Sequence, residues 1–168
     1  TIISLLENNV GYSPSGGLLA LRNEISSYYS EKLNIKINFN NVVISPANLL
    51  IFQFIDIICD TDDIVVLFTP AFPTYIAACN YIGVQTKSIP LSINDSFQLK
   101  KKHIDDALSL KPKAIIINSG NNPTGAVYDE KILDYLVEKA IQKDCWILSD
   151  ETYGMLSFNK TFFSMLNY

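Results

Sequence analysis

Residues 114–150 read AIIINSGNNPTGAVYDEKILDYLVEKAIQKDCWILSD. This stretch predicts a buried strand over 114–118, an amphipathic helix over 130–143 and a second strand over 145–149. The prediction rests on two short apolar runs that flank a segment with apolar residues at helical spacing. Because a strand, a helix and a strand in this order form a parallel pair, the stretch predicts a parallel sheet with a helix packed on it.

The rest of the chain repeats this alternation. We expect helices over 18–33, 47–59, 72–82 and 104–110, and strands over 42–44, 64–68 and 84–89. Ser15 is the expected cap of the first helix, and Gly83 is expected to end the third. The pattern predicts an α/β fold with a mainly parallel sheet covered by helices on both faces, formed by residues 1–168 as a single domain.

Composition narrows the class of protein. The 168 residues include 13 Lys and Arg and 17 Asp and Glu, which gives a net charge of −4, and 48% are hydrophobic. This apolar content excludes a disordered chain, and an acidic balance with Arg22 as the one arginine argues against nucleic-acid binding. The longest apolar run, residues 49–58, is too short to span a membrane, and no secretory signal is visible, so we expect a cytoplasmic protein.

Three cysteines, Cys59, Cys79 and Cys145, are odd in number and form no CxxC pair. This spacing indicates neither a disulfide framework nor a zinc site. We expect three free thiols that are buried as apolar side chains in a reducing compartment.

Four polar loops follow the predicted strands, at 45–48 (SPAN), 69–75 (TPAFPTY), 119–125 (SGNNPTG) and 149–154 (SDETYG). Ligands of parallel α/β sheets bind at the carboxyl ends of the strands. We therefore expect side chains from these loops to converge on one crevice.

Asp150 lies just past the apolar run 146–148, where an ionised carboxylate needs a cation or strong donors. A protonated heterocyclic nitrogen would serve, although an Asp that caps a turn is the commoner case. Tyr153 is able to donate its hydroxyl to a phenolate oxygen, or simply to pack. Asn122 offers an amide donor, and the alternative is an ordinary loop of turn-forming residues. Phe72 is placed to stack on a flat ring, or is a core aromatic residue.

Taken in order, four motifs resemble those of the fold type I pyridoxal-5′-phosphate enzymes, most closely the class I and II aminotransferases. The motifs are YSPSGGLLALR at 12–22, PAFPTY at 70–75, NNPTG at 121–125 and SDETY at 149–153. The resemblance covers nearly the whole chain, and four motifs in register are stronger evidence than any single one.

The resemblance implies that these loops hold the pyridine ring of pyridoxal phosphate. Asp150 would keep the pyridine nitrogen protonated, so that the ring accepts electrons from the substrate. Asn122 and Tyr153 would bind the phenolic oxygen, and Phe72 would stack on the ring.

The phosphate contacts are implied at the start of the helix expected at 47–59. Ala47 and Asn48 would donate backbone N–H groups there, as helix N-termini do, and Tyr12 would reach the phosphate of a partner subunit's cofactor in a homodimer. Where the family carries a small or glycine-rich phosphate turn, this chain has Pro46-Ala47-Asn48.

The resemblance also implies a Schiff-base lysine downstream of the Asp-x-x-Tyr motif, at a position that we expect beyond Tyr168. Lys160 lies too near Asp150 for that role, and His103 lies outside all four loops. We therefore assign no catalytic residue and expect a fragment of the large domain that is inactive by itself. The parent would transfer an amino group between an amino acid and a 2-oxo acid, and which amino acid is left open.

Other functions stay open at this point. The same cofactor serves lyases, eliminating enzymes and amino-acid oxidase-like relatives, and the fold does not settle the reaction. Aminotransferase-like domains also occur as sensing modules of transcription regulators joined to a DNA-binding domain. A degenerate structural subunit without the lysine is a third alternative.

Overall fold

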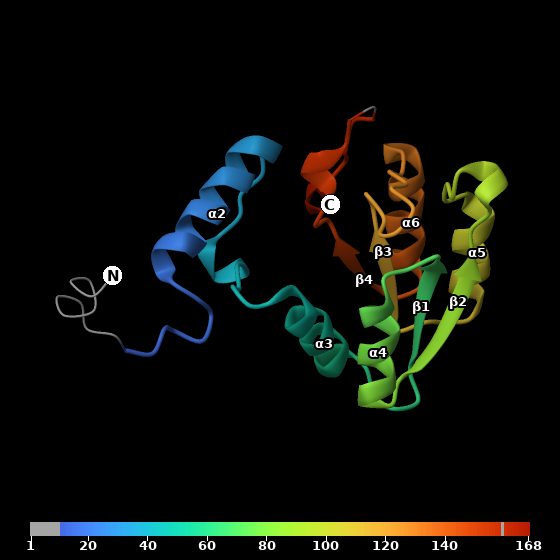
Figure 1. Ribbon diagram of the computed structural model, residues 1–168, viewed down its shortest axis with the longest axis horizontal. Helices are drawn as coiled ribbons and strands as arrows, with labels where there is room; N and C mark the ends of the chain where they lie inside the picture. The colour runs from blue at the N-terminus through green and yellow to red at the C-terminus, as the bar shows by residue number, and fades with distance from the viewer. Residues whose placement is uncertain (1–10, 159) are drawn as a thin grey trace. The chain divides into compact units, whose positions relative to one another are not determined.

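The computed structural model describes residues 11–158 and 160–168. The chain divides into two compact units, Thr1–Pro46 and Ala47–Tyr168. The described part of the first unit contains helix α2 (Leu19–Leu33) and the 3-10 turn η1 (Phe39–Asn41). The second unit contains the sheet and its covering helices (Figure 1). The assignment of residues 1–168 to a single domain stays a prediction.

The sheet of the second unit has four strands in the described part of the chain. They are β1 (Ile64–Thr69), β2 (Gln85–Pro90), β3 (Ala114–Asn118) and β4 (Trp146–Asp150). Their order across the sheet is β2-β1-β3-β4, and all three pairings are parallel. In the register of β3 and β4, Asn118 pairs with Asp150, so the last residues of the two strands lie side by side.

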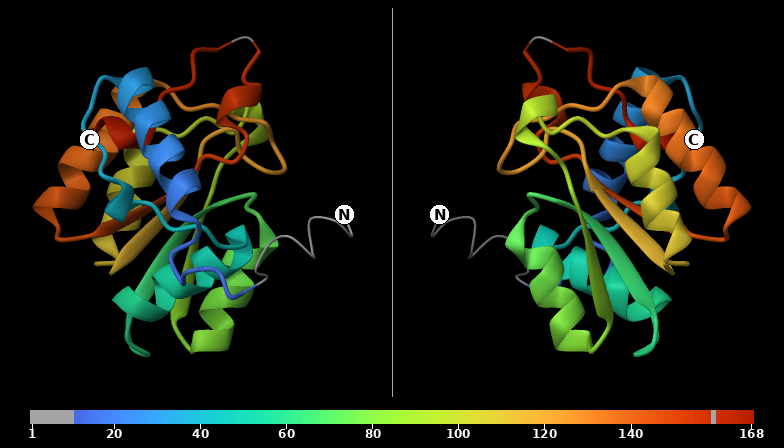
Figure 2. Two further views of the ribbon diagram at one scale, coloured as in Figure 1. Left: turned by 90° about the vertical axis from the view of Figure 1, so that its left-hand side faces the viewer. Right: turned by 90° about the vertical axis from the view of Figure 1, so that its right-hand side faces the viewer.

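Helices cover both faces of this sheet, as predicted (Figure 2). One core packs Val65 and Leu67 of β1 against α3 (Ala47–Ile58) and α4 (Pro73–Ile82). The opposite core packs Val66 of the same strand against α5 (Lys101–Ser109) and α6 (Glu130–Gln142). Successive residues of a strand face opposite sides, and each buried aliphatic side chain stabilises the fold by about 1.5–3 kcal/mol. The predicted α/β fold with a parallel sheet is confirmed.

Local sequence explains several element ends. Gly83 ends α4 in the left-handed conformation, with φ 89°, which confirms the predicted stop. Helix α5 begins at Lys101, three residues before the predicted start. The backbone N–H of Lys100 donates to Nδ1 of His103 at 3.2 Å, and this contact closes the first turn. The polar residues 100–103 therefore start the helix.

Two predictions for the first unit are wrong. Residues 42–44 form no strand, because the Arg22 guanidinium binds the carbonyl oxygens of Val42 and Phe39 at 2.7 and 2.9 Å. The backbone N–H of Ile44 donates to Gly16 instead of to a strand. The residue that precedes α2 is Leu18, with no side-chain cap, rather than Ser15.

The three cysteines are free, as predicted. Cys59 and Cys79 are buried, whereas Cys145 is partly exposed, because it lies beside the edge strand β4. Among the described residues, no group of three or more His, Cys, Asp or Glu side chains is arranged to hold a metal ion. None of the described helices has the length and apolar character needed to cross a membrane.

Candidate functional site

The candidate site is built at the carboxyl ends of β3 and β4. Asn118 is the last residue of β3 and is buried, because β3 lies inside the sheet with helices on both faces. Its Nδ2 donates to the backbone carbonyl oxygen of Asp150 at 2.8 Å. Its Oδ1 accepts the backbone N–H of Asn122, also at 2.8 Å. The two loops that follow these strands are therefore tied together by one buried side chain.

The Asp150 carboxylate is half-buried and accepts three hydrogen bonds. Oδ1 accepts the backbone N–H of Thr152 at 3.0 Å and its hydroxyl at 2.7 Å. Oδ2 accepts the hydroxyl of Tyr75 at 2.7 Å. Asp150 thus makes the turn contact expected of an Asp after a strand, and it also has the strong donors that a carboxylate at this position needs.

Tyr75 lies on α4 and is 2% exposed. Burial, and then the hydrogen bond to Asp150, raise the pKa of its phenol well above the usual range, so the hydroxyl stays a donor. Phe72 precedes the same helix, and its ring meets the Tyr75 ring edge-on, with centroids 5.8 Å apart and an interplanar angle of 79°. Asp150 and Phe72 are therefore connected through Tyr75.

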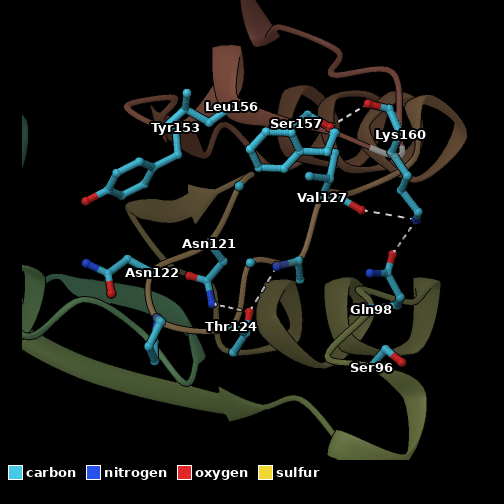
Figure 3. Close-up of a pocket in the computed structure, with 15 residues that line it drawn as sticks. Ser96, Gln98, Asn121, Asn122, Thr124, Val127, Tyr153, Leu156, Ser157 and Lys160 are labelled. Atoms are coloured by element: carbon cyan, nitrogen blue, oxygen red, sulfur yellow. Dashed lines mark hydrogen bonds between the residues drawn. The ribbon is translucent and has the colours of Figure 1, made fainter.

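A pocket of about 590 Å³ is lined in part by the loops that follow β3 and β4 (Figure 3). It is lined by Ser96, Gln98, Gly120, Asn121, Asn122, Pro123, Thr124, Gly125, Ala126, Val127, Tyr153, Leu156, Ser157, Phe158 and Lys160. Figure 3 shows the side chains of Asn122 and Tyr153 extending to the same side of the pocket. In the described part of the chain no hydrogen bond engages the Asn122 carboxamide, whereas its backbone N–H binds Asn118. Asp150 and Phe72 lie outside the lining of this pocket.

Two further residues hold the loops in place. Asn121 donates its Nδ2 to the carbonyl oxygen of Pro70 at 3.0 Å and to the Thr124 hydroxyl at 2.8 Å, which joins the loop after β1 to the loop after β3. Gly120 has φ 77°, and a Cβ on it would lie 3.3 Å from the carbonyl carbon and the Cβ of Tyr153. A glycine at this position lets the loops after β3 and β4 approach closely.

Three of the four predicted loops meet, and the fourth does not follow a strand. Ala47 and Asn48 are exposed residues that begin α3, after a segment without strand structure, and they do not line the pocket. Tyr12 belongs to the first unit, and its role toward a partner subunit stays a prediction. The expectation that all four loops follow strands is thus wrong for residues 45–48, because residues 42–44 bind Arg22 and Gly16 instead.

Sequence reasoning assigned no role to Asn118, Tyr75 or Thr152. Asn118 carries the same signal that singled out Asp150, a polar residue at the end of an apolar strand. Tyr75 lies about one helical turn after Phe72, a spacing that places both side chains on one side of a helix start. Thr152 gave no signal beyond its place in a polar loop.

Comparison with known proteins gives the family. The family model for class I and II aminotransferases matches residues 4–167. The chain is 33% identical over 153 residues to a probable aspartate/prephenate aminotransferase of Aquifex aeolicus, and the match covers 90% of this chain and 39% of that protein. It is 30% identical over 156 residues to an aspartate aminotransferase of Bacillus subtilis, with 92% of this chain and 40% of that protein covered.

The fold is shared over nearly the whole chain. The crystal structure of an aspartate aminotransferase from Thermotoga maritima superposes with a TM-score of 0.91 at 30% identity, covering 99% of this chain and 44% of that one. The chain therefore spans about 40% of the length of the curated relatives it matches. With a family model matched from residue 4 to residue 167 and the large-domain fold in place, the chain belongs to the class I and II aminotransferases, pyridoxal-phosphate enzymes of fold type I.

Proposed function

We propose that this chain is a cofactor-binding part of an aminotransferase large domain. The full-length protein would use pyridoxal 5′-phosphate to transfer an amino group between an amino acid and a 2-oxo acid. Family membership supports this proposal, and so does the naming of several relatives as aspartate aminotransferases. The observation that carries it is the Asp150 carboxylate, held by three donors at the end of β4 and tied through Asn118 to the loop that bears Asn122.

The donor set fits the ring of this cofactor. A carboxylate matches a protonated ring nitrogen, and a carboxamide and a phenol match an anionic oxygen. The Asn122 carboxamide makes no hydrogen bond in the described part of the chain, and Tyr153 lines the same pocket. This pocket has a volume of about 590 Å³, and Asp150 and Phe72 lie outside its lining.

Each of these residues would have a defined task in the transfer. When bound, pyridoxal phosphate supplies an electron sink for the negative charge that develops on the substrate α-carbon. Asp150 would hold the proton on the ring nitrogen by accepting it in a charge-assisted hydrogen bond. Asn122 and Tyr153 would donate to the phenolic oxygen, and Phe72 would cover one face of the ring and exclude water from it.

The remaining contacts are also proposals. Ala47 and Asn48 occupy the first turn of α3, where backbone N–H groups have no partner within the helix, and they would bind the phosphate. Tyr12 would reach the phosphate of a partner subunit in a homodimer. Sedimentation of the full-length protein as a monomer at micromolar concentration would contradict this shared site. The cytoplasmic location stays a prediction.

Binding of pyridoxamine 5′-phosphate to this chain tests the proposal. This probe has no aldehyde, so it does not label exposed lysines and reports non-covalent contacts alone. We expect Asp150→Asn to raise the Kd about tenfold or more, because it removes the charge that faces the ring nitrogen. Asp144→Asn is the matched control, since Asp144 precedes β4 at the opposite end of the strand.

The control should bind as the wild-type chain does. Equal affinity of the Asp150→Asn and Asp144→Asn variants would overturn the assignment of Asp150. Competition with inorganic phosphate separates the contribution of the ligand's phosphate group from that of its ring. If phosphate competes equally well in all variants, the phosphate group alone drives binding.

A further inference from the structure

The two oxygens of the Asp150 carboxylate are not equivalent. An ionised carboxylate has about four lone-pair sites, two on each oxygen. Oδ1 accepts two hydrogen bonds, both from Thr152. Among residues 11–158 and 160–168, Oδ2 accepts only the hydroxyl of Tyr75. The remaining acceptor site of the carboxylate is therefore on Oδ2.

Tyr75 is held firmly in the structure. Its ring is buried in the core between α4 and the sheet, with Val65 and Leu67 of β1 in the same cluster. Its hydroxyl reaches from this core to Oδ2 of Asp150 at 2.7 Å. Because packing fixes the Tyr75 hydroxyl, the hydrogen bond that it donates fixes the orientation of the Asp150 carboxylate. The lone pair of Oδ2 that Tyr75 does not use therefore points in a defined direction.

The same tyrosine ring also contacts Phe72. The rings of Phe72 and Tyr75 meet edge-on with centroids 5.8 Å apart, a geometry that aromatic pairs favour. One buried side chain thus touches both the carboxylate proposed for the ring nitrogen and the aromatic ring proposed for the face of the cofactor.

We infer that Tyr75 is a positioning residue for the cofactor ring, and that Oδ2 of Asp150 is the oxygen that accepts the ring N–H. This inference rests on the proposed function. Tyr75 acts through Asp150 and Phe72 and needs no contact of its own with the ligand.

Two ligands separate this role from a merely structural one. They are pyridoxamine 5′-phosphate and its 1-deaza analogue, in which a C–H group replaces the ring nitrogen. Tyr75→Phe keeps the packed ring and removes only the hydroxyl. We expect this variant to raise the Kd of pyridoxamine 5′-phosphate about tenfold and to leave the Kd of the deaza analogue unchanged within about twofold.

Tyr135→Phe is the matched control. Tyr135 donates to Oδ1 of Asp105 at 2.7 Å, which repeats the tyrosine–aspartate pair between α5 and α6, away from the pocket. This variant should bind both ligands as the wild-type chain does. If Tyr75→Phe weakens both ligands equally, Tyr75 supports only the fold and the inference is overturned.

A second variant covers the case in which Tyr75→Phe does not fold. Thr152 is exposed, and Thr152→Ala removes one donor from Oδ1 while Oδ2 keeps its contact with Tyr75. We expect its Kd for pyridoxamine 5′-phosphate to stay within about threefold of wild type. A loss as large as that of Asp150→Asn would identify Oδ1 as the acceptor and overturn the inference.

The outcomes also separate this inference from the proposed function. Failure of Asp150→Asn to weaken binding contradicts the proposed function. If Asp150→Asn binds more weakly but Tyr75→Phe binds both ligands as the wild-type chain does, only the role of Tyr75 is contradicted.

Discussion

The side-chain amide of Asn118 donates to the backbone carbonyl oxygen of Asp150 at 2.8 Å, across the carboxyl ends of two neighbouring strands. The Oδ1 atom of the same amide accepts the backbone N–H of Asn122. Both partners belong to loops that carry proposed cofactor contacts. Asn118 thus lies behind the site and holds its two loops at a set distance, without lining the pocket.

Asn118→Ala should therefore destabilise the protein and loosen the site. It removes two hydrogen bonds at a buried position and leaves a carbonyl oxygen and an N–H group without partners, which amounts to about 2–3 kcal/mol. Urea unfolding measures the loss. Asn94→Ala, at an exposed position in the 3-10 turn Ile93–Asp95, should stay within about 0.5 kcal/mol of wild type. Equal stability of the two variants would contradict the bridging role of Asn118.

Two glycines of one loop test how closely the loops after β3 and β4 approach each other. Gly120 and Gly125 have φ 77° and 70°, so alanine is strained at both positions. A Cβ at Gly120 would lie 3.3 Å from Tyr153, whereas a Cβ at Gly125 meets nothing within 4 Å. We expect Gly125→Ala to lower the free energy of unfolding by about 1 kcal/mol, and Gly120→Ala to lower it by about 1 kcal/mol more.

Gly120→Ala should also displace Tyr153, because the added methyl group would lie too close to the Tyr153 backbone. Binding of pyridoxamine 5′-phosphate would then be weaker in Gly120→Ala than in Gly125→Ala. The same affinity and the same stability in both variants would show that the loops tolerate a side chain at Gly120.

Stability should fall at alkaline pH because of the cysteines. Burial raises the pKa of the Cys59, Cys79 and Cys145 thiols from 9.0 to about 11. In the unfolded chain these thiols lose their protons near pH 9, whereas in the folded chain they keep them up to about pH 11. The unfolded state therefore gains stability first, and the free energy of unfolding falls as the pH rises from 9 to 11.

Urea midpoints at pH 8, 9, 10 and 11, under reducing conditions, measure this dependence. Cys79→Ala removes one fully buried thiol, so its stability should fall less steeply over the same interval. Parallel curves for this variant and the wild-type chain would contradict a contribution from Cys79.

Lys160 should resist covalent modification by pyridoxal phosphate, although it lines the pocket. Its Nζ donates to Gln98 at 3.2 Å and to the Val127 carbonyl oxygen at 3.3 Å (Figure 3). It also donates to Asp129 at 3.2 Å. Covalent modification of Nζ would have to break these three contacts. Incubation with pyridoxal phosphate, borohydride reduction and peptide mapping should show diffuse labelling of exposed lysines, with no preference for Lys160.

Asp129→Asn removes the charged partner and should increase the labelling of Lys160 relative to the other lysines. Stoichiometric labelling of Lys160 in the wild-type chain would overturn both this prediction and the absence of a catalytic assignment for it.

Local pattern was enough to predict most of the elements of the second unit. The apolar run at 114–118, the helical spacing at 130–143 and the glycine after α4 each depend on neighbours within one element. The same local reasoning failed at residues 42–44, where the β-branched run is bound by Arg22, a residue twenty positions away. Strand propensity is weak when no partner strand is present.

The sequence by itself therefore determined the α/β class, the parallel sheet and the loops that carry Asp150, Asn122, Tyr153 and Phe72. Only the tertiary structure decided which of these loops meet and through which side chains. The hydroxyl of Tyr75 reaches Asp150 across 75 positions, and it does so because α4 packs on the face of a sheet in which β1 lies next to β3 and β3 next to β4. The strand order depends on how whole helices and strands pack together. A hydrogen bond that depends on the strand order cannot be predicted from the residues that neighbour Tyr75 or Asp150 in the sequence.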